Sequence, residues 1–152
     1  MAVQAQNMKA VRVISPVAIV DNAVFANTEI NTHGYDYCTV LVNIGVTDVA
    51  MTTLKIQECD TSGGTFANIS GLTYGSATNI DGSTSTLPSS TADNTIVAFD
   101  IDLRGRKKYL QLVAQAGDGS AGTYASAVAL LSRGDKAPTN ASERGCGQVL
   151  RV

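Results

Sequence analysis

Short runs in which apolar and polar residues alternate recur along most of the chain, and this pattern constrains the fold more than any other feature of the sequence. In the run TIVAFDIDL, residues Val97, Phe99 and Ile101 share one face, whereas Asp100 and Asp102 share the other. Successive side chains of a β-strand point to opposite faces of a sheet, so this alternation predicts a half-buried strand.

About eight runs of this kind follow one another, separated by turn-forming residues at short intervals, and no stretch has the period of an amphipathic helix. The run TYASAVALLS contains helix-favouring Ala and Leu, but the glycine-rich turn before it and the glycine after it favour a strand. The pattern therefore predicts an all-β fold, an antiparallel β-sandwich. We expect a jelly roll, with an immunoglobulin-like sandwich as the alternative.

The predicted organisation is one sandwich domain with an arm at each end. Residues 1–8 are expected to form an N-terminal arm, residues 9–132 the sandwich, and residues 133–152 an extended C-terminal arm. Within the sandwich, CTVLVNIGV and MTTLKIQEC are expected to pair as a hairpin around residues 47–50. The small and polar residues 76–94 are expected to form a long loop.

Composition narrows the possible partners. The chain has 152 residues, of which 44% are hydrophobic and 16% charged, so it can bury a core and is not disordered. Its net charge of −2 supplies no field that would attract nucleic acid. No apolar run approaches the roughly 20 residues of a membrane span, and the start MAVQAQNMKA lacks the layout of a signal peptide. We therefore expect a soluble protein made in a cytoplasm, with neither nucleic acid nor membrane as a partner.

The candidate metal ligands are few. The three cysteines Cys38, Cys59 and Cys146 cannot all pair within one chain, and a bond between Cys38 and Cys59 would need a bulge in the expected hairpin. We interpret them as reduced thiols. His33 is the only histidine, and no C-x-x-C spacing occurs, so we expect no zinc site.

The sequence also lacks the residue sets of common catalytic sites. His33 lies in the turn-like stretch NTHGYD, which is typical of a surface loop. Asp100 and Asp102 share a strand face without a third acidic residue beside them, so we interpret them as a solvated face and not as a glycosidase or calcium site. We therefore predict a non-enzyme without catalytic residues, cofactor, metal or small-molecule substrate.

One concentration of positive charge stands out. Arg104, Arg106, Lys107 and Lys108 fall in a turn between two predicted strands. The simpler interpretation is a solvated tip that prevents wrong strand pairing. The alternative is a site that binds an acidic patch on another protein.

The C-terminal arm is the second candidate binding segment. Most of it is too small and polar to extend a core, but it ends in a β-prone run, Val149, Leu150, Arg151 and Val152. We expect this run to add a strand to the sheet edge of a neighbouring subunit, with main-chain bonds giving affinity. The alternative is that the arm folds back onto its own sandwich as a last strand.

Three stretches together resemble a known group of proteins. They are LKIQECDTSGGTFANISG, AFDIDLRGRKKYLQLVAQAG and YASAVALLSRGDKAP. Their order and texture resemble the β-sandwich head decoration (cement) proteins of tailed bacteriophages over roughly residues 9–138. The resemblance rests on a D-x-S-G-G-x-F hairpin, then R-G-R-K-K-Y-L-Q-L, then a strand of small residues and a basic tail.

This resemblance implies a structural role on a virion. Proteins of this group sit on the outer surface of the capsid, often as trimers, and clamp neighbouring major capsid subunits. The implied partners are the major capsid protein and two further copies of the chain, without a cofactor. Two alternatives remain: a carbohydrate or host-surface binding module, which the absence of Trp disfavours, and another virion component such as a tail or connector protein.

Overall fold

The computed structural model describes residues 7–76, 85–136, 138 and 140–150. Within them the chain forms eight strands and no helix, as the alternating runs predicted. The last strand is the TYASAVALLS run, which confirms its assignment as a strand. The strands are β1 (Lys9–Ile14), β2 (Ile30–Asn31), β3 (Tyr37–Thr47), β4 (Thr53–Cys59), β5 (Ala67–Thr73), β6 (Thr95–Asp102), β7 (Tyr109–Gln115) and β8 (Thr123–Ser132).

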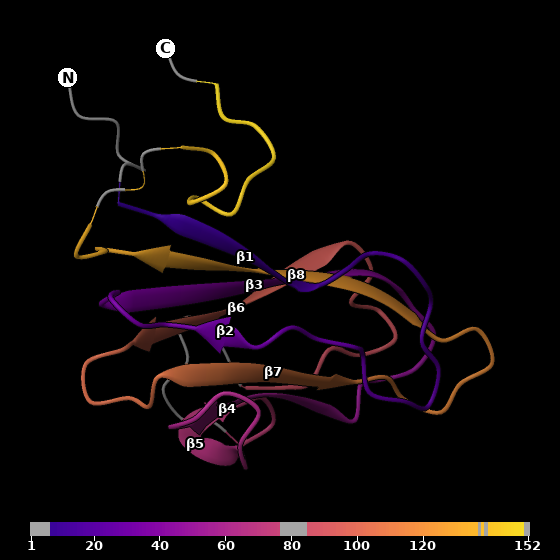
Figure 1. The fold of residues 1–152 in the computed structure, drawn as a ribbon. Helices are drawn as coiled ribbons and strands as arrows, with labels where there is room; N and C mark the ends of the chain where they lie inside the picture. Colours follow the sequence, from indigo (N-terminus) through magenta and orange to yellow (C-terminus); the bar gives the residue numbers. More distant parts are fainter. Residues whose placement is uncertain (1–6, 77–84, 137, 139, 151–152) are drawn as a thin grey trace.

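The strands form two four-stranded sheets that pack face to face (Figure 1). One sheet has the order β1-β8-β3-β6 and the other β2-β7-β4-β5. The first strand pairs with the last, the second with the second last, and so on inward. The pairs are β1 with β8, β2 with β7, β3 with β6 and β4 with β5, and every pair is antiparallel. The chain is thus one long hairpin rolled up so that successive pairs fall alternately in the two sheets. This arrangement is a jelly roll, as predicted, and its strand order excludes the immunoglobulin-like alternative.

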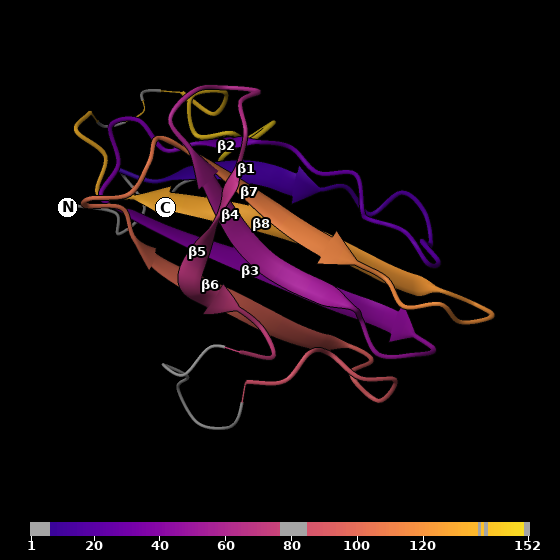
Figure 2. The same cartoon turned by 90° about the horizontal axis from the view of Figure 1, so that it is seen from below.

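The predicted hairpin around residues 47–50 is wrong. Strands β3 and β4 lie in opposite sheets, and the chain crosses from one sheet to the other between them (Figure 2). Period two specifies which face of a strand is buried but not which strand lies beside it, and both strands bury their apolar face in the same core from opposite sides. Cys38 and Cys59 consequently belong to different sheets, and all three thiols are unpaired.

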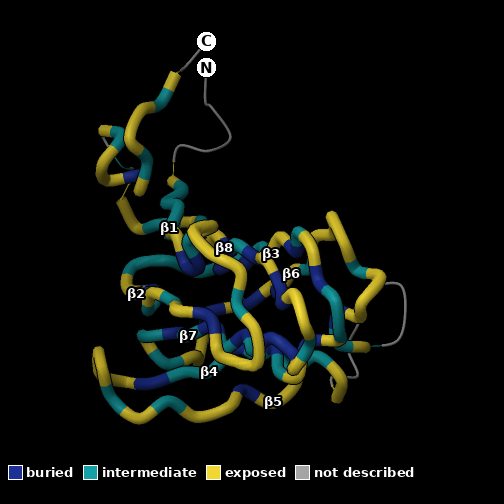
Figure 3. The backbone as a smooth tube through the Cα atoms, turned by 90° about the vertical axis from the view of Figure 1, so that its right-hand side faces the viewer, coloured by how far each residue is buried: buried dark blue, intermediate teal, exposed yellow. Residues whose placement is uncertain are grey.

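The core fills the space between the two sheets, where the buried residues lie in Figure 3. Inward positions alternate strictly with outward ones along β8, and along β3 as far as Ile44, after which the register shifts. The buried residues of β8 include the small Ala125, Ala127 and Ala129. The side of the sandwich between β5 and β6 is closed by Tyr74, whose ring meets Phe99 edge to face at 5.1 Å between centroids. The interior is therefore packed with apolar side chains.

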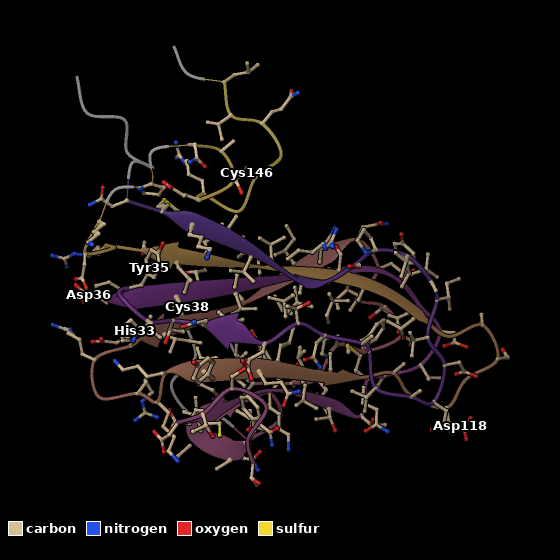
Figure 4. All side chains as sticks on the ribbon, in the orientation of Figure 1. His33, Tyr35, Asp36, Cys38, Asp118 and Cys146 are labelled. Carbon is tan, nitrogen blue, oxygen red and sulfur yellow. The ribbon has the colours of Figure 1, made fainter. Side chains whose placement is uncertain are left out.

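The loops gather at two opposite ends. His33 and Asp36, in the β2–β3 connection, lie at one end of the sandwich, and Asp118, in the β7–β8 connection, lies at the other (Figure 4). Of the predicted loop 76–94, residues 77–84 lie outside the described part, and residues 85–94 contain no strand. The described residues include no helix of the length and apolarity that crossing a membrane requires.

Candidate functional site

The basic turn, which we define as Arg104, Arg106, Lys107 and Lys108, connects β6 to β7 and so crosses from one sheet to the other. Carboxylates at the end of β6 and at the end of β4 lie beside it. They form three ion pairs: Arg104 with Asp102 at 2.5 Å, Arg106 with Glu58 at 3.6 Å, and Lys107 with Asp60 at 3.1 Å. Its positive charge is therefore largely offset within the chain.

These pairs are reflected in the pKa values of the turn. Hydrogen bonds from the Arg104 side chain and backbone lower the pKa of Asp102 to about 2. The hydrogen bond to Asp60 raises the pKa of Lys107. Lys108 is exposed and forms no ion pair with any described residue. A solvated tip accounts for this geometry better than a free basic patch does.

A second cluster lies beside the turn, around the ring of Tyr37 at the start of β3. The guanidinium groups of Arg104 and Arg133 each lie 5.6 Å from the centre of this ring. Arg133 directly follows β8 and has a positive φ of 52°. Stacking on an aromatic ring holds an arginine in place while leaving its N–H groups free to donate.

The remaining candidate residues do not converge. His33 is exposed in the turn between β2 and β3, where the sequence predicted a surface loop. Asp100 and Asp102 lie on the outward face of β6, and Asp100 accepts a hydrogen bond of 2.8 Å from the Thr39 hydroxyl. Within residues 7–76, 85–136, 138 and 140–150, no three His, Cys, Asp or Glu side chains are grouped as metal ligands.

The outward face of the β1-β8-β3-β6 sheet has an apolar centre. Leu41 on β3 lies between Ala98 on β6 and Val128 on β8, and neighbouring rows add further apolar side chains. Ile96 is 66% exposed and Val128 39% exposed. We name the following set the apolar outer face: Ala10, Leu41, Ile96, Ala98, Tyr124, Val128 and Leu130.

The outward face of the β2-β7-β4-β5 sheet is polar by contrast. Gln57 on β4 lies between Asn68 on β5 and Gln111 on β7. Its side-chain amide donates to the Asn68 oxygen at 2.8 Å. The next row contains Lys55. The two outer faces of one sandwich thus differ in chemistry, and the exposed apolar side chains concentrate on one of them.

The C-terminal arm lies above β1, on the outer side of the β1-β8-β3-β6 sheet (Figures 1 and 3). The N–H of Ala10 donates to the carbonyl of Arg144 at 2.8 Å, so part of the arm lies along the β1 edge. Residues 141–145 form a turn, and residues 140–146 contain no strand. Of the predicted docking run, Val149 and Leu150 also form no strand, and Arg151 and Val152 lie outside the described residues.

Comparisons of the chain with protein-family models, with curated proteins and with solved structures find no match. The assignment of a site therefore depends on the geometry above. Sequence reasoning missed the apolar outer face, although its signal was present: in TYASAVALLS both alternating sets contain apolar residues, Ala125, Ala127 and Ala129 inward and Val128 and Leu130 outward.

Proposed function

We propose that this chain is a structural protein of a virion, which decorates the outer surface of the capsid and clamps neighbouring major capsid subunits as a homotrimer. The observation that carries the proposal is the difference between the two outer faces. The apolar outer face binds the shell, and the polar face of the β2-β7-β4-β5 sheet remains in contact with water.

The position of the C-terminal arm supports this orientation. The arm rises on the same side of the molecule as the apolar outer face (Figure 3). A subunit of the shell that lies on this face therefore also meets the arm, whereas the opposite face has no such extension. The shell subunit then contacts both the sheet face and the arm, which gives a larger contact area than the sheet face alone.

The fold is compatible with this role, by analogy only, because jelly rolls occur in viral capsid proteins and also in lectins and cupins. Larger β-barrels enclose ligand cavities. Here the inward positions are filled by apolar side chains, among them Ile56 and Leu112, neither of which is exposed. Because the apolar core occupies the interior, we place the binding site on the outer surface.

The test is a pair of matched substitutions, one on each outer face. Val128→Glu places a carboxylate on the apolar outer face directly across from Arg12, and Val113→Glu places one on the polar face directly across from Lys55. Each new carboxylate faces a basic residue on the adjacent strand, so the two variants have similar local electrostatics. Binding is measured by co-sedimentation with shells from which the chain has been removed.

We expect Val128→Glu to lose binding by roughly tenfold or more, since a contact on this face removes both the new carboxylate and Arg12 from water, and this desolvation costs more than their attraction returns. Val113→Glu should bind like the unmodified chain. Equal binding of both variants, or absence of the chain from virions analysed by mass spectrometry, would contradict the proposal.

A further inference from the structure

Two arginines beside the apolar outer face have no charged partner within the chain. Arg12 on β1 lies directly opposite Val128, and Arg133 directly follows β8. Both arginines are exposed, and neither forms an ion pair with any carboxylate in the part of the chain that the structure describes. Arg104, which also lies near this face, is by contrast paired with Asp102.

Both unpaired arginines border the apolar outer face. Arg12 lies in the row that runs through Val128 to Leu41 at the centre of this face. The guanidinium of Arg133 lies over the ring of Tyr37, which is four residues before Leu41 on β3 and points to the same side of the sheet. Since a strand rises about 3.3 Å per residue, these two positions on β3 are about 13 Å apart. A surface that covers the apolar outer face therefore reaches both arginines.

The backbone holds Arg133 in a fixed place. Its φ of 52° is a left-handed conformation that residues other than glycine rarely adopt. The residues on both sides of it are anchored. The Ser132 carbonyl accepts from the Asp36 N–H at 3.3 Å, and the Gly134 N–H donates to the Asn7 carbonyl at 3.2 Å. Because the position of Arg133 is set before a partner arrives, less conformational freedom is lost on binding.

An open cavity beside Arg133 has room for a side chain of another protein. Its volume is about 660 Å³, and it is lined by residues 7, 8, 36 and 132–135. Its two carboxylates are Asp36, labelled in Figure 4, and Asp135, and neither forms an ion pair with a described residue. These carboxylates repel a doubly charged anion more strongly than a singly charged one, which favours a carboxylate over a phosphate as the partner of Arg133.

Burial of the two arginines requires an opposite charge. The proposed contact with the shell removes Arg12 and Arg133 from water, and a charge that is buried without a partner is strongly unfavourable. We propose that Arg12 and Arg133 each bind a carboxylate, an Asp or Glu side chain, of the major capsid subunit that lies on the apolar outer face. A guanidinium suits this role because its N–H groups match the two oxygens of a carboxylate. The partner surface is thus an apolar patch bordered by acidic residues.

Three charge-neutralising substitutions test this inference, which rests on the proposed function. They are Arg12→Gln, Arg133→Gln and, as the matched control, Lys55→Gln on the polar face of the opposite sheet. Each removes one positive charge, and thermal unfolding checks that each variant is folded. Binding is measured by co-sedimentation with shells from which the chain has been removed. We expect each arginine variant to bind roughly tenfold or more weakly, because it leaves a carboxylate of the shell buried and unpaired. Lys55→Gln should bind like the unmodified chain.

Shells with neutralised carboxylates test the chemistry of the partner. Treatment with a carbodiimide and methylamine converts exposed carboxylates of the shell to neutral amides. The unmodified chain should bind treated shells more weakly than untreated ones. A chain with both Arg12→Gln and Arg133→Gln should lose little further affinity on treated shells, because the ion pairs are already absent.

Binding of either arginine variant as tight as that of Lys55→Gln would overturn the inference. So would an equal loss of affinity by the unmodified chain and the double variant on treated shells. A loss of binding with Val128→Glu but not with the arginine variants would contradict this inference alone. An unmodified chain that does not bind shells would contradict the proposed function and this inference with it, so the two failures are distinguishable.

Discussion

At the scale of single residues, the buried thiol of Cys38 links stability to pH. Cys38 is fully buried between the sheets, and burial raises its pKa from 9.0 to about 12. Above pH 9 the unfolded chain loses a proton that the folded chain keeps. The raised pKa therefore lowers the free energy of unfolding between pH 9 and about 12, by at most about 1.4 kcal/mol per pH unit.

The measurement compares urea unfolding of the unmodified chain and of Cys38→Ala across this pH range. Burial also raises the pKa values of Tyr35 and Tyr74, but these tyrosines are present in both chains. Cys38→Ala should be less stable at pH 7, because it leaves a small cavity, yet lose stability less steeply above pH 9. Parallel curves for the two chains would show that the thiol is not responsible.

At the scale of structural elements, Gly145 determines how the arm meets β1. Its φ is 72°, and an added Cβ would overlap the Ala10 carbonyl. Gly145→Ala should therefore displace the arm from the β1 edge and leave the sandwich folded. Since a left-handed conformation costs an alanine about 1–2 kcal/mol, amide exchange at Ala10 should become roughly tenfold faster.

The control is Gly147→Ala in the same arm, where an added Cβ meets no atom within 4 Å. Hydrogen exchange followed by mass spectrometry or NMR reports both variants. Unchanged exchange at Ala10 in Gly145→Ala would mean that the arm does not protect this edge.

Strands were predictable from sequence to a larger extent than their partners were. The alternation in β3 and β6 is local, and burial of Val40, Val42, Phe99 and Ile101 follows from it. The partner of β3 depends on how all eight strands pair, and residues 38–59 alone do not specify this pairing. The hairpin prediction was therefore wrong.

In the candidate sites too, local structure could be predicted from the sequence, whereas contacts between distant segments could not. That the basic turn is a turn could be predicted from its own residues. That its charges are offset could not, because Arg106 meets Glu58, which is distant in the sequence and arrives from another strand. The contrast between the two outer faces likewise requires the strand order, since each face combines residues from four strands.

At the scale of the whole molecule, the jelly roll separates two kinds of surface. The same core supports a polar sheet on one side and, on the other, a sheet with an apolar centre and the C-terminal arm above it (Figure 1). The proposed contact through the apolar outer face fixes the orientation of the chain on the shell. This orientation can be observed in a structure of the assembled particle.

The most direct measurement is a cryo-EM reconstruction of virions that carry the chain. The β1-β8-β3-β6 sheet should face the shell, with Leu41 and Val128 at the contact, and Gln57 and Gln111 should face the solvent. A reconstruction in which the β2-β7-β4-β5 sheet lies on the shell and the apolar outer face is open to solvent would contradict this orientation.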